Sequence, residues 1–283
     1  MKIPATRRPD RWQLPATWPQ QLSDRLRQRG ETPELSRRYR SIAAVPLAYG
    51  RHRGPAPVRA RRAAVLVGIY EDVSGTNGVS SAEGLHGGSM SQKAAADALV
   101  VPDAHQPLTS LRHMRVLLTR RPSLLKHHGG QICFPGGRVE SGEDTREAAL
   151  REFAEELGRP ALVRQWIGRL ACQYVYASDN RVTPWVAWLH KDPTPWCPDP
   201  AEVDEVLDLP LETLLRQVVA GNLSRHTEIR SVRRGEHRVG HLQFRTPAFA
   251  HGEHKVWGAT AMILDELAQH LLTLSDVPVG PAN

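Results

Sequence analysis

The sequence predicts an α/β fold, an α/β/α sandwich in which a mixed sheet lies between layers of helices. Three observations lead to this prediction. The continuous apolar run over residues 63–69 is typical of a buried strand. The stretch that ends at Gly158 and the stretch over residues 260–272 both place apolar residues at helical spacing. Further strand-like segments separate these helices along the chain, as a layered α/β domain requires.

The N-terminal part of the chain carries few signals for regular structure. Residues 1–19 are rich in proline and arginine and are expected to be irregular. Leu22 and Leu26 stand among polar residues and predict a short helix that ends at Gly30. The composition of residues 46–57 predicts a linker. After the first strand, Gly, Ser, Ala and polar residues dominate residues 73–113, which we expect to be a flexible insertion because loops of this length are uncommon within a domain.

The rest of the chain alternates between strand-like and helix-like segments. Strands are predicted over residues 114–119, 166–176, 182–190 and 203–207, and a strand pair between residues 228 and 244 that turns around Gly235. Helices are predicted over residues 211–219 and 260–272, the second closing the domain. We therefore divide the chain into an Arg/Pro-rich extension (1–60), a main folded domain (61–275, with the insertion at 73–113) and a tail (276–283).

The most informative segment runs from Gly137 to Gly158. With about 100° per residue on a helix, its three glutamates share one face and its apolar residues share another, so we expect the acids to face outward and the apolar side to pack on the sheet. These glutamates are Glu152, Glu155 and Glu156. Ser141 is the expected N-cap of this helix, and Gly158, followed by Pro160, is expected to end it. An ordinary solvated acidic face accounts for the glutamates alone, but not for their joint spacing with Gly137, Glu143 and Arg151.

That joint spacing resembles the Nudix box, the signature of hydrolases that cut a nucleoside diphosphate linked to another group. The resemblance implies a Nudix-type sandwich in which Mg²⁺ or Mn²⁺ is held by Glu152, Glu155 and Glu156. It also implies a catalytic set of Glu152, Arg151 and Glu156, with Arg151 orienting the glutamates by ion pairing. Arg159 departs from the pattern, which has an apolar residue after the last glycine.

Residues 117–137, LLTRRPSLLKHHGGQICFPGG, resemble the extra motif of coenzyme A diphosphatases. The resemblance implies phosphate binding by Arg121 and Lys126, and close approach of the backbone to substrate at Gly136 and Gly137. Lys126 stands where arginine is usual; it keeps the charge but loses the bidentate fork. The implied reaction is the metal-dependent hydrolysis of the pyrophosphate bond of coenzyme A and acyl-CoA derivatives. Its products would be 3′,5′-ADP and 4′-phosphopantetheine or its acyl form.

Two other functions stay open at this point. The enzyme could act on another nucleoside diphosphate derivative, such as ADP-ribose or a dinucleotide. The chain could also be a non-enzymatic protein that binds nucleic acid through its arginine-rich extension, although the intact acidic set argues against this. The general base is likewise open, with Glu152 and four later acids as candidates: Glu202, Asp204, Glu205 and Glu253. Arg120, His127 and His128 are further candidates for phosphate contact.

The net charge of +7 is unevenly distributed. Residues 1–62 hold 15 basic and four acidic residues, a net +11, which leaves −4 for the remainder. We interpret the basic extension as a solvated or packing segment, because no RNA-binding signature accompanies it. The three cysteines have no metal-ligand spacing and indicate reduced thiols in a cytoplasmic protein. No apolar run approaches the roughly 18 residues of a membrane span, and no secretory signal is expected.

Overall fold

A mixed sheet forms the centre of the computed structural model, which describes residues 13–28, 58–72, 109–125, 128–175, 178–220, 224–234 and 237–274. Within these ranges the sheet has eight strands, five of them in the order β10-β4-β2-β9-β7, with β5, β6 and β8 paired to β4, β2 and β9. The central pair, β2 and β9, is parallel and the other pairs are antiparallel. The strands are β2 (Arg61–Glu71), β4 (Met114–Arg120), β5 (Ile132–Cys133), β6 (Gly136–Arg138), β7 (Val163–Arg169), β8 (Gln173–Val175), β9 (Asn180–Leu189) and β10 (Glu205–Pro210).

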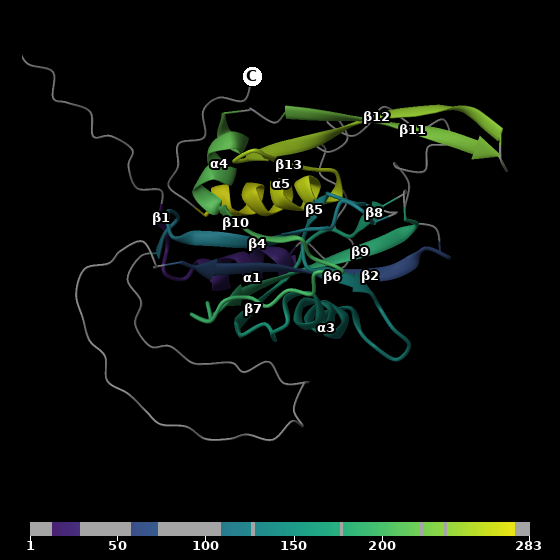
Figure 1. Cartoon of the computed structure of the whole chain (residues 1–283). Helices are drawn as coiled ribbons and strands as arrows, with labels where there is room; N and C mark the ends of the chain where they lie inside the picture. The colour runs from purple at the N-terminus through teal and green to yellow at the C-terminus, as the bar shows by residue number, and fades with distance from the viewer. Residues whose placement is uncertain are drawn as a thin grey trace, which may run out of the picture.

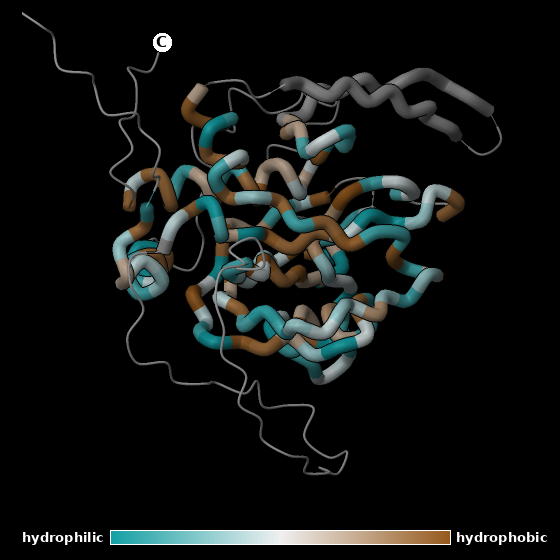
Figure 2. The backbone as a smooth tube through the Cα atoms, turned by 60° about the vertical axis from the view of Figure 1, so that its left-hand side comes forward, coloured by the Kyte–Doolittle hydropathy of each residue, from teal (hydrophilic) through white to brown (hydrophobic). Residues whose placement is uncertain are grey.

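Helices cover both faces of this sheet, as predicted. Figure 1 shows α3 (Thr145–Leu157) on one face and α4 (Leu211–Val219) and α5 (Ala259–Leu272) on the other. Each face has its own core, because alternate residues of β2 point in opposite directions: Leu66 packs in the cluster under α3, and Val67 packs in the cluster under α5. Figure 2 shows several hydrophobic stretches along the strands between these layers. The predicted α/β/α sandwich with a mixed sheet is thus the observed fold.

The N-terminal helix α1 (Trp18–Gln28) belongs to the same core as α5. Trp18, Leu22 and Leu26 are buried, and the Trp18 ring lies 5.7 Å from the ring of Trp188. Just before it, β1 (Gln13–Leu14) pairs with β3 (Thr109–Ser110). The expectation of irregular structure throughout residues 1–19 is therefore wrong for these segments, because leucine and tryptophan side chains find apolar partners that the local sequence does not reveal. Residues 73–108 lie outside the described part, and the division into domains stays a prediction.

The predicted strand over residues 166–176 is two strands, β7 and β8. The two strands are separated by residues 170–172. Within β7, Gly168 has φ +152°, and the register between β7 and β9 shifts beside it. A Cβ at Gly168 would lie 3.2 Å from Leu26 Cδ1, so the packing of α1 also favours glycine at this position. The predicted strand over residues 203–207 is displaced to β10, which begins at Glu205.

A smaller sheet carries the last strands before α5. It contains β11 (Ser224–Arg234), β12 (His237–His251) and β13 (His254–Trp257), in that order. The β11–β12 hairpin, which extends away from the domain in Figure 1, matches the predicted strand pair but is longer than predicted; Gly235 lies outside the described residues. The helix predictions over residues 211–219 and 260–272 are confirmed by α4 and α5. In the ranges described, no helix combines the length and apolar character needed to cross a membrane.

Candidate functional site

Helix α3 begins at a capping box rather than at Ser141. The N-cap is Asp144, whose Oδ1 accepts hydrogen bonds from the backbone N–H groups of Arg146 (2.6 Å) and Glu147 (2.9 Å). In return, Glu147 Oε2 accepts from the Asp144 backbone N–H at 2.8 Å. The prediction of Ser141 as N-cap is wrong because the loop continues for three more residues before its backbone becomes helical. These hydrogen bonds to Asp144, led by that of the Glu147 N–H, hold its pKa below the usual range.

The end of α3 is fixed at Gly158, as predicted. Gly158 adopts a left-handed conformation with φ +70°, and a Cβ there would lie 2.1 Å from the carbonyl oxygen of Cys197. The following loop is bound to the last turn of the helix by two backbone hydrogen bonds, from Cys197 N to Leu157 O (3.1 Å) and from Asp199 N to Glu156 O (3.1 Å). Both ends of the acidic helix are thus held by specific backbone contacts.

Arg151 connects the acidic residues of the segment. Its Nε donates to Glu143 Oε1 at 2.9 Å and its Nη2 donates to the carbonyl oxygen of Arg138 at 2.9 Å. Its Nη1 lies 3.1 Å from Glu152 Oε1 and donates to Glu155 Oε2 at 2.9 Å. The hydrogen bond to Glu143 is the main reason that the pKa of Arg151 is raised, and the same bond lowers the pKa of Glu143.

The Glu152 carboxylate lies directly against Gly137. A Cβ at Gly137 would be 2.3 to 2.4 Å from the three atoms of that carboxylate group, closer than any side chain permits. Burial raises the pKa of Glu152, and the charges of Glu155 and Glu202 act in the same direction, while Arg151 opposes them. Glycine at position 137 therefore leaves space for the Glu152 carboxylate, which is partly buried there.

Glu156 is buried, which the helical pattern did not predict. Its relative exposure is 2%, and its Oε2 has no hydrogen-bond partner among the described residues. Burial raises the pKa of Glu156 to about 8, supported by Glu152 and Glu202 and opposed by the charge of Arg121 and the backbone N–H of Gly136. The expectation that all three acids face outward is wrong for Glu156, because β6 and the loop after β4 cover this side of the helix.

Comparison with known proteins gives this arrangement a family. The model of the NUDIX domain matches residues 94–226. The protein called Uncharacterized Nudix hydrolase NudL of Photorhabdus laumondii is 33% identical over 175 residues, which cover 62% of this chain and 83% of that protein. This chain belongs to the Nudix hydrolase family. Such hydrolases act on small-molecule nucleoside diphosphate derivatives and generally use divalent metal ions such as Mg²⁺ or Mn²⁺.

Two further relatives have printed names that bear on the substrate. Mitochondrial coenzyme A diphosphatase NUDT8 of Homo sapiens is 36% identical over 170 residues, 59% of this chain and 66% of that protein. Nudix hydrolase 3 of Caenorhabditis elegans is 31% identical over 157 residues, 53% of this chain and 64% of that protein. The matches thus span slightly less than two thirds of the length of these two relatives. Among solved structures, the MutT protein from Methanosarcina mazei Go1 shares 16% identity and a TM-score of 0.35, covering 56% of this chain and 85% of that one.

The acids of the Nudix box have the right chemistry for a divalent cation but do not converge in this structure. Across the described ranges, no three His, Cys, Asp or Glu side chains are arranged to hold a metal ion. Arg151 draws Glu152 and Glu155 toward itself, whereas Glu156 lies deeper, beside β6. Carboxylate oxygens are nevertheless the ligands that Mg²⁺ and Mn²⁺ prefer. The buried Oε2 of Glu156 has no hydrogen-bond partner among the described residues, and a bound cation would be a partner for it. The donor set therefore fits such an ion, and the assignment of ligands stays a prediction.

The loop after β4 brings Arg121 to the box. Backbone hydrogen bonds from Arg121 N to Gln131 O and from Gly130 N to Arg121 O, both 3.0 Å, close this loop at its base. Arg121 is half-buried and close enough to Glu156 for its charge to lower the pKa of that acid. Lys126 and His127 lie outside the described residues, so their predicted roles stay predictions. His128 is engaged locally, with Nδ1 2.8 Å from Gln131 Oε1.

Two of the four later acids are paired with Arg120, and the other two are not. Arg120 forms ion pairs with Asp204 and Glu205, each at 2.9 Å, and this pairing engages all three side chains. Glu253 is exposed in the turn between β12 and β13. Glu202 differs from these, because its charge raises the pKa of both Glu152 and Glu156. Among the candidate bases from later loops, Glu202 thus has the observed electrostatic link to the Nudix helix.

Cys133 adjoins the same place without being a nucleophile. Desolvation raises the pKa of its thiol to about 11, so the group stays protonated near neutral pH. Its Sγ lies 3.5 Å from Thr119 Oγ1. Cys133 is therefore a neutral thiol that packs next to the site.

Proposed function

We propose that this Nudix hydrolase cleaves the pyrophosphate bond of coenzyme A and acyl-CoA derivatives, using Mg²⁺ or Mn²⁺. The products would be 3′,5′-ADP and 4′-phosphopantetheine or its acyl form. What carries the proposal is the proximity of two motifs: the loop that resembles the coenzyme A diphosphatase motif lies close enough to the Nudix helix for the charge of Arg121 to lower the pKa of Glu156. The similarity to a protein named mitochondrial coenzyme A diphosphatase supports the same substrate.

In this proposal some side chains hold the cation, some contact the phosphates, and one orients the acids. Glu152, Glu155 and Glu156 would hold the divalent ion, and such an ion would supply positive charge against the phosphates and acidify a water molecule. Arg151 orients Glu152 and Glu155 through the contacts described above. Arg121 and Lys126 would contact phosphate oxygens, and glycine at positions 136 and 137 would let the backbone approach the substrate.

The reaction needs a group that removes a proton from water. We favour Glu202 as this general base, because it is the later acid whose charge is felt by Glu152 and Glu156. A Glu202 carboxylate oxygen would take the proton while the water oxygen bonds to one phosphorus of the pyrophosphate. The bond from that phosphorus to the bridging oxygen then breaks, and the bridging oxygen leaves with the other phosphate. Asp204 and Glu205 are less suited, since both are paired with Arg120.

A substrate panel tests the proposal. Hydrolysis of coenzyme A, acetyl-CoA, ADP-ribose and a dinucleotide is followed with Mg²⁺ and with Mn²⁺, and with Glu156→Gln as the inactive control. We expect coenzyme A and its thioesters to have the highest kcat/KM. A clear preference for ADP-ribose or the dinucleotide would replace the proposed substrate within the same family. Salt-dependent RNA binding without hydrolysis of any pyrophosphate would support the nucleic-acid alternative instead.

We also propose the organisation and location expected from the sequence. The catalytic unit would span residues 61–275, preceded by the basic extension 1–60 and followed by the tail 276–283. The free thiols of Cys133, Cys172 and Cys197 support a reducing compartment, and we place the enzyme in the cytoplasm. Fluorescence microscopy of the tagged full chain checks this location, and a mitochondrial signal would contradict it.

A further inference from the structure

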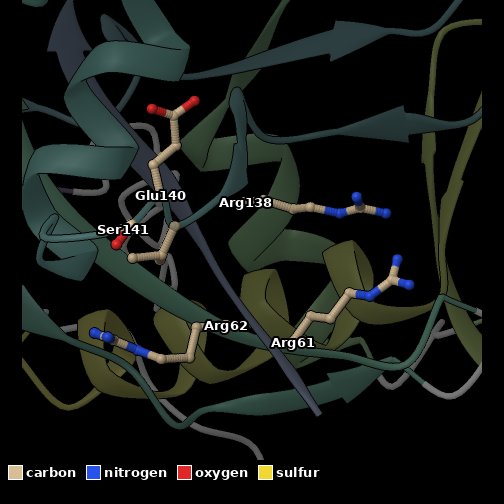
Figure 3. A pocket seen from close by; sticks show the side chains of 6 residues that line it. Arg61, Arg62, Arg138, Glu140 and Ser141 are labelled. Atoms are coloured by element: carbon tan, nitrogen blue, oxygen red, sulfur yellow. The ribbon is translucent and has the colours of Figure 1, made fainter. Parts of the chain in front are cut away.

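A basic hollow lies where β2 and β6 meet. Its volume is about 440 Å³ and it is lined by Arg61, Arg62, Arg138, Val139, Glu140 and Ser141. Figure 3 shows the side chains of Arg61 and Arg138 extending to the same side, while Arg62 points the other way. The side chains of these three arginines make no contact in the site described above; only the backbone carbonyl of Arg138 does, by accepting a hydrogen bond from Arg151.

Strand pairing accounts for this arrangement. Ala63 of β2 lies opposite Arg138 of β6, so Arg61, two residues earlier on β2, is on the same face as Arg138 and diagonal to it. Diagonal neighbours on paired strands are about 7–8 Å apart, within reach of long side chains. Arg62 belongs to the opposite face, where its charge lowers the pKa of Asp144.

The two arginines on this face lack an acidic partner. Among the described residues, no carboxylate lies within 4 Å of the guanidinium group of Arg61 or Arg138, although 11 other ion pairs are present in the same part of the chain. Glu140 lines the hollow, but in Figure 3 its side chain points away from both groups. Two adjacent guanidinium groups repel each other, so an anion with two or more acceptor oxygens would be bound favourably between them.

The hollow is linked to the acidic helix through the backbone of β6, because the Arg138 side chain points to the opposite face of this strand from Gly137 and Glu152. Arg138 follows Gly137, which lies against Glu152, and the Arg138 carbonyl oxygen accepts a hydrogen bond from Arg151 Nη2 at 2.9 Å. The pyrophosphate is proposed to react next to Gly137, and a single peptide unit joins Gly137 to the Cα atom of Arg138. An anion held by Arg61 and Arg138 would belong to the same ligand as the pyrophosphate.

We propose that Arg61 and Arg138 form a subsite for a phosphomonoester dianion of the substrate, separate from the pyrophosphate that is cleaved. This inference rests on the proposed function, which identifies the anion as the 3′-phosphate of coenzyme A. A ribose separates that group from the 5′-pyrophosphate, so the substrate presents two neighbouring anionic centres. The two guanidinium groups would make the enzyme prefer coenzyme A over dephospho-coenzyme A, which differs only in this phosphate.

The test compares both substrates in three proteins. These are the wild type, the double variant Arg61→Gln/Arg138→Gln, and the control Arg62→Gln, which removes one charge from the same hollow on the side that faces Asp144. We expect the double variant to lose roughly 10- to 100-fold in kcat/KM for coenzyme A while keeping its value for dephospho-coenzyme A. The control should keep the wild-type preference. A preference that survives in the double variant, or that falls equally in the control, would overturn the proposal.

A binding measurement separates this inference from the proposed function. Calorimetry compares 3′,5′-ADP with 5′-AMP, which lacks the extra phosphate, and needs no turnover. If the wild type hydrolyses no coenzyme A but binds 3′,5′-ADP more tightly, and the double variant does not, the subsite stands and the proposed reaction fails. Equal affinity of the wild type for both nucleotides would refute the subsite. The variants Arg61→Lys and Arg138→Lys, which keep the charge, should retain part of the preference and provide the test if the double variant does not fold.

Discussion

Burial of Glu156 predicts that the catalytic helix lowers the stability of the metal-free protein. The pKa of this acid rises from 4.5 to about 8 in the folded state. Because the folded protein then binds more protons than the unfolded chain between these values, stability falls as the pH rises from 4.5 to 8. Integrated to pH 8, this linkage corresponds to a loss of about 4 kcal/mol relative to a group that stays neutral.

Glu156→Gln removes the ionisable group and keeps its shape. The buried amide lacks a hydrogen-bond partner, as Oε2 does now, at a cost of about 1–2 kcal/mol, so we expect a net gain of about 2–3 kcal/mol at pH 8. For a protein of this size that gain raises the Tm by roughly 5–10 °C. At pH 4.5 the linkage contributes little, so the cost of the buried amide should remain alone and Glu156→Gln should be about 1–2 kcal/mol less stable than the wild type.

The assay is thermal unfolding in the presence of a chelator at pH 4.5, 6 and 8. Glu155→Gln serves as a control, since Glu155 is on the same helix but 57% exposed and paired with Arg151, so removing its charge should give no gain in stability at pH 8. Addition of Mn²⁺ should raise the Tm of the wild type and not that of Glu156→Gln, which should also lose hydrolysis by orders of magnitude. A Tm difference between Glu156→Gln and wild type that is the same at every pH would refute the reasoning.

Three further predictions follow from contacts in the site. Gly137→Ala places a methyl group 2.3–2.4 Å from the Glu152 carboxylate and should lower kcat about 100-fold, measured by steady-state hydrolysis, whereas a near-normal kcat would contradict the close approach. Asp144→Ala removes both cap hydrogen bonds and should cost about 1–2 kcal/mol in urea unfolding, while Ser141→Ala should be neutral; equal effects would argue against the observed cap. Arg151→Lys keeps the charge but loses the planar fork and should reduce kcat at least about tenfold, with unchanged activity counting against the orienting role.

Local sequence predicted helices α3, α4 and α5, with an error at the start of α3. The ends of α3 and α4 depend on signals within a few residues, such as Gly158 at the C-terminus of α3. The face shared by Glu152, Glu155 and Glu156 follows from helical geometry alone. The error at the start of α3 arose because Ser141 and Asp144 both have side chains that can cap, and the glutamate three residues after Asp144 completes the capping box.

Local sequence could not predict how deeply each side chain is buried, or which residues far apart in the sequence come into contact. Periodicity gives the direction of Glu156 but not what covers it, which is decided by β6 and the loop that carries Arg121. Arg61 and Arg138 are far apart in sequence and meet through the pairing of β2 with β6. The packing of α1 likewise depends on partners more than 100 residues away, such as Trp188 of β9.

The backbone hydrogen bonds between the end of α3 and the 197–199 segment have a mechanical consequence. Glu202 N and Val203 N both donate to Asp199 O, at 3.0 and 2.8 Å, so the turn that carries Glu202 is anchored to a segment that is itself anchored to the helix. Main-chain atoms make all these links. Side-chain substitutions in this turn should therefore leave the distance between Glu202 and α3 nearly constant, whereas the insertion of one residue would change it. Any movement of α3 would carry Glu202 along as part of the same rigid unit.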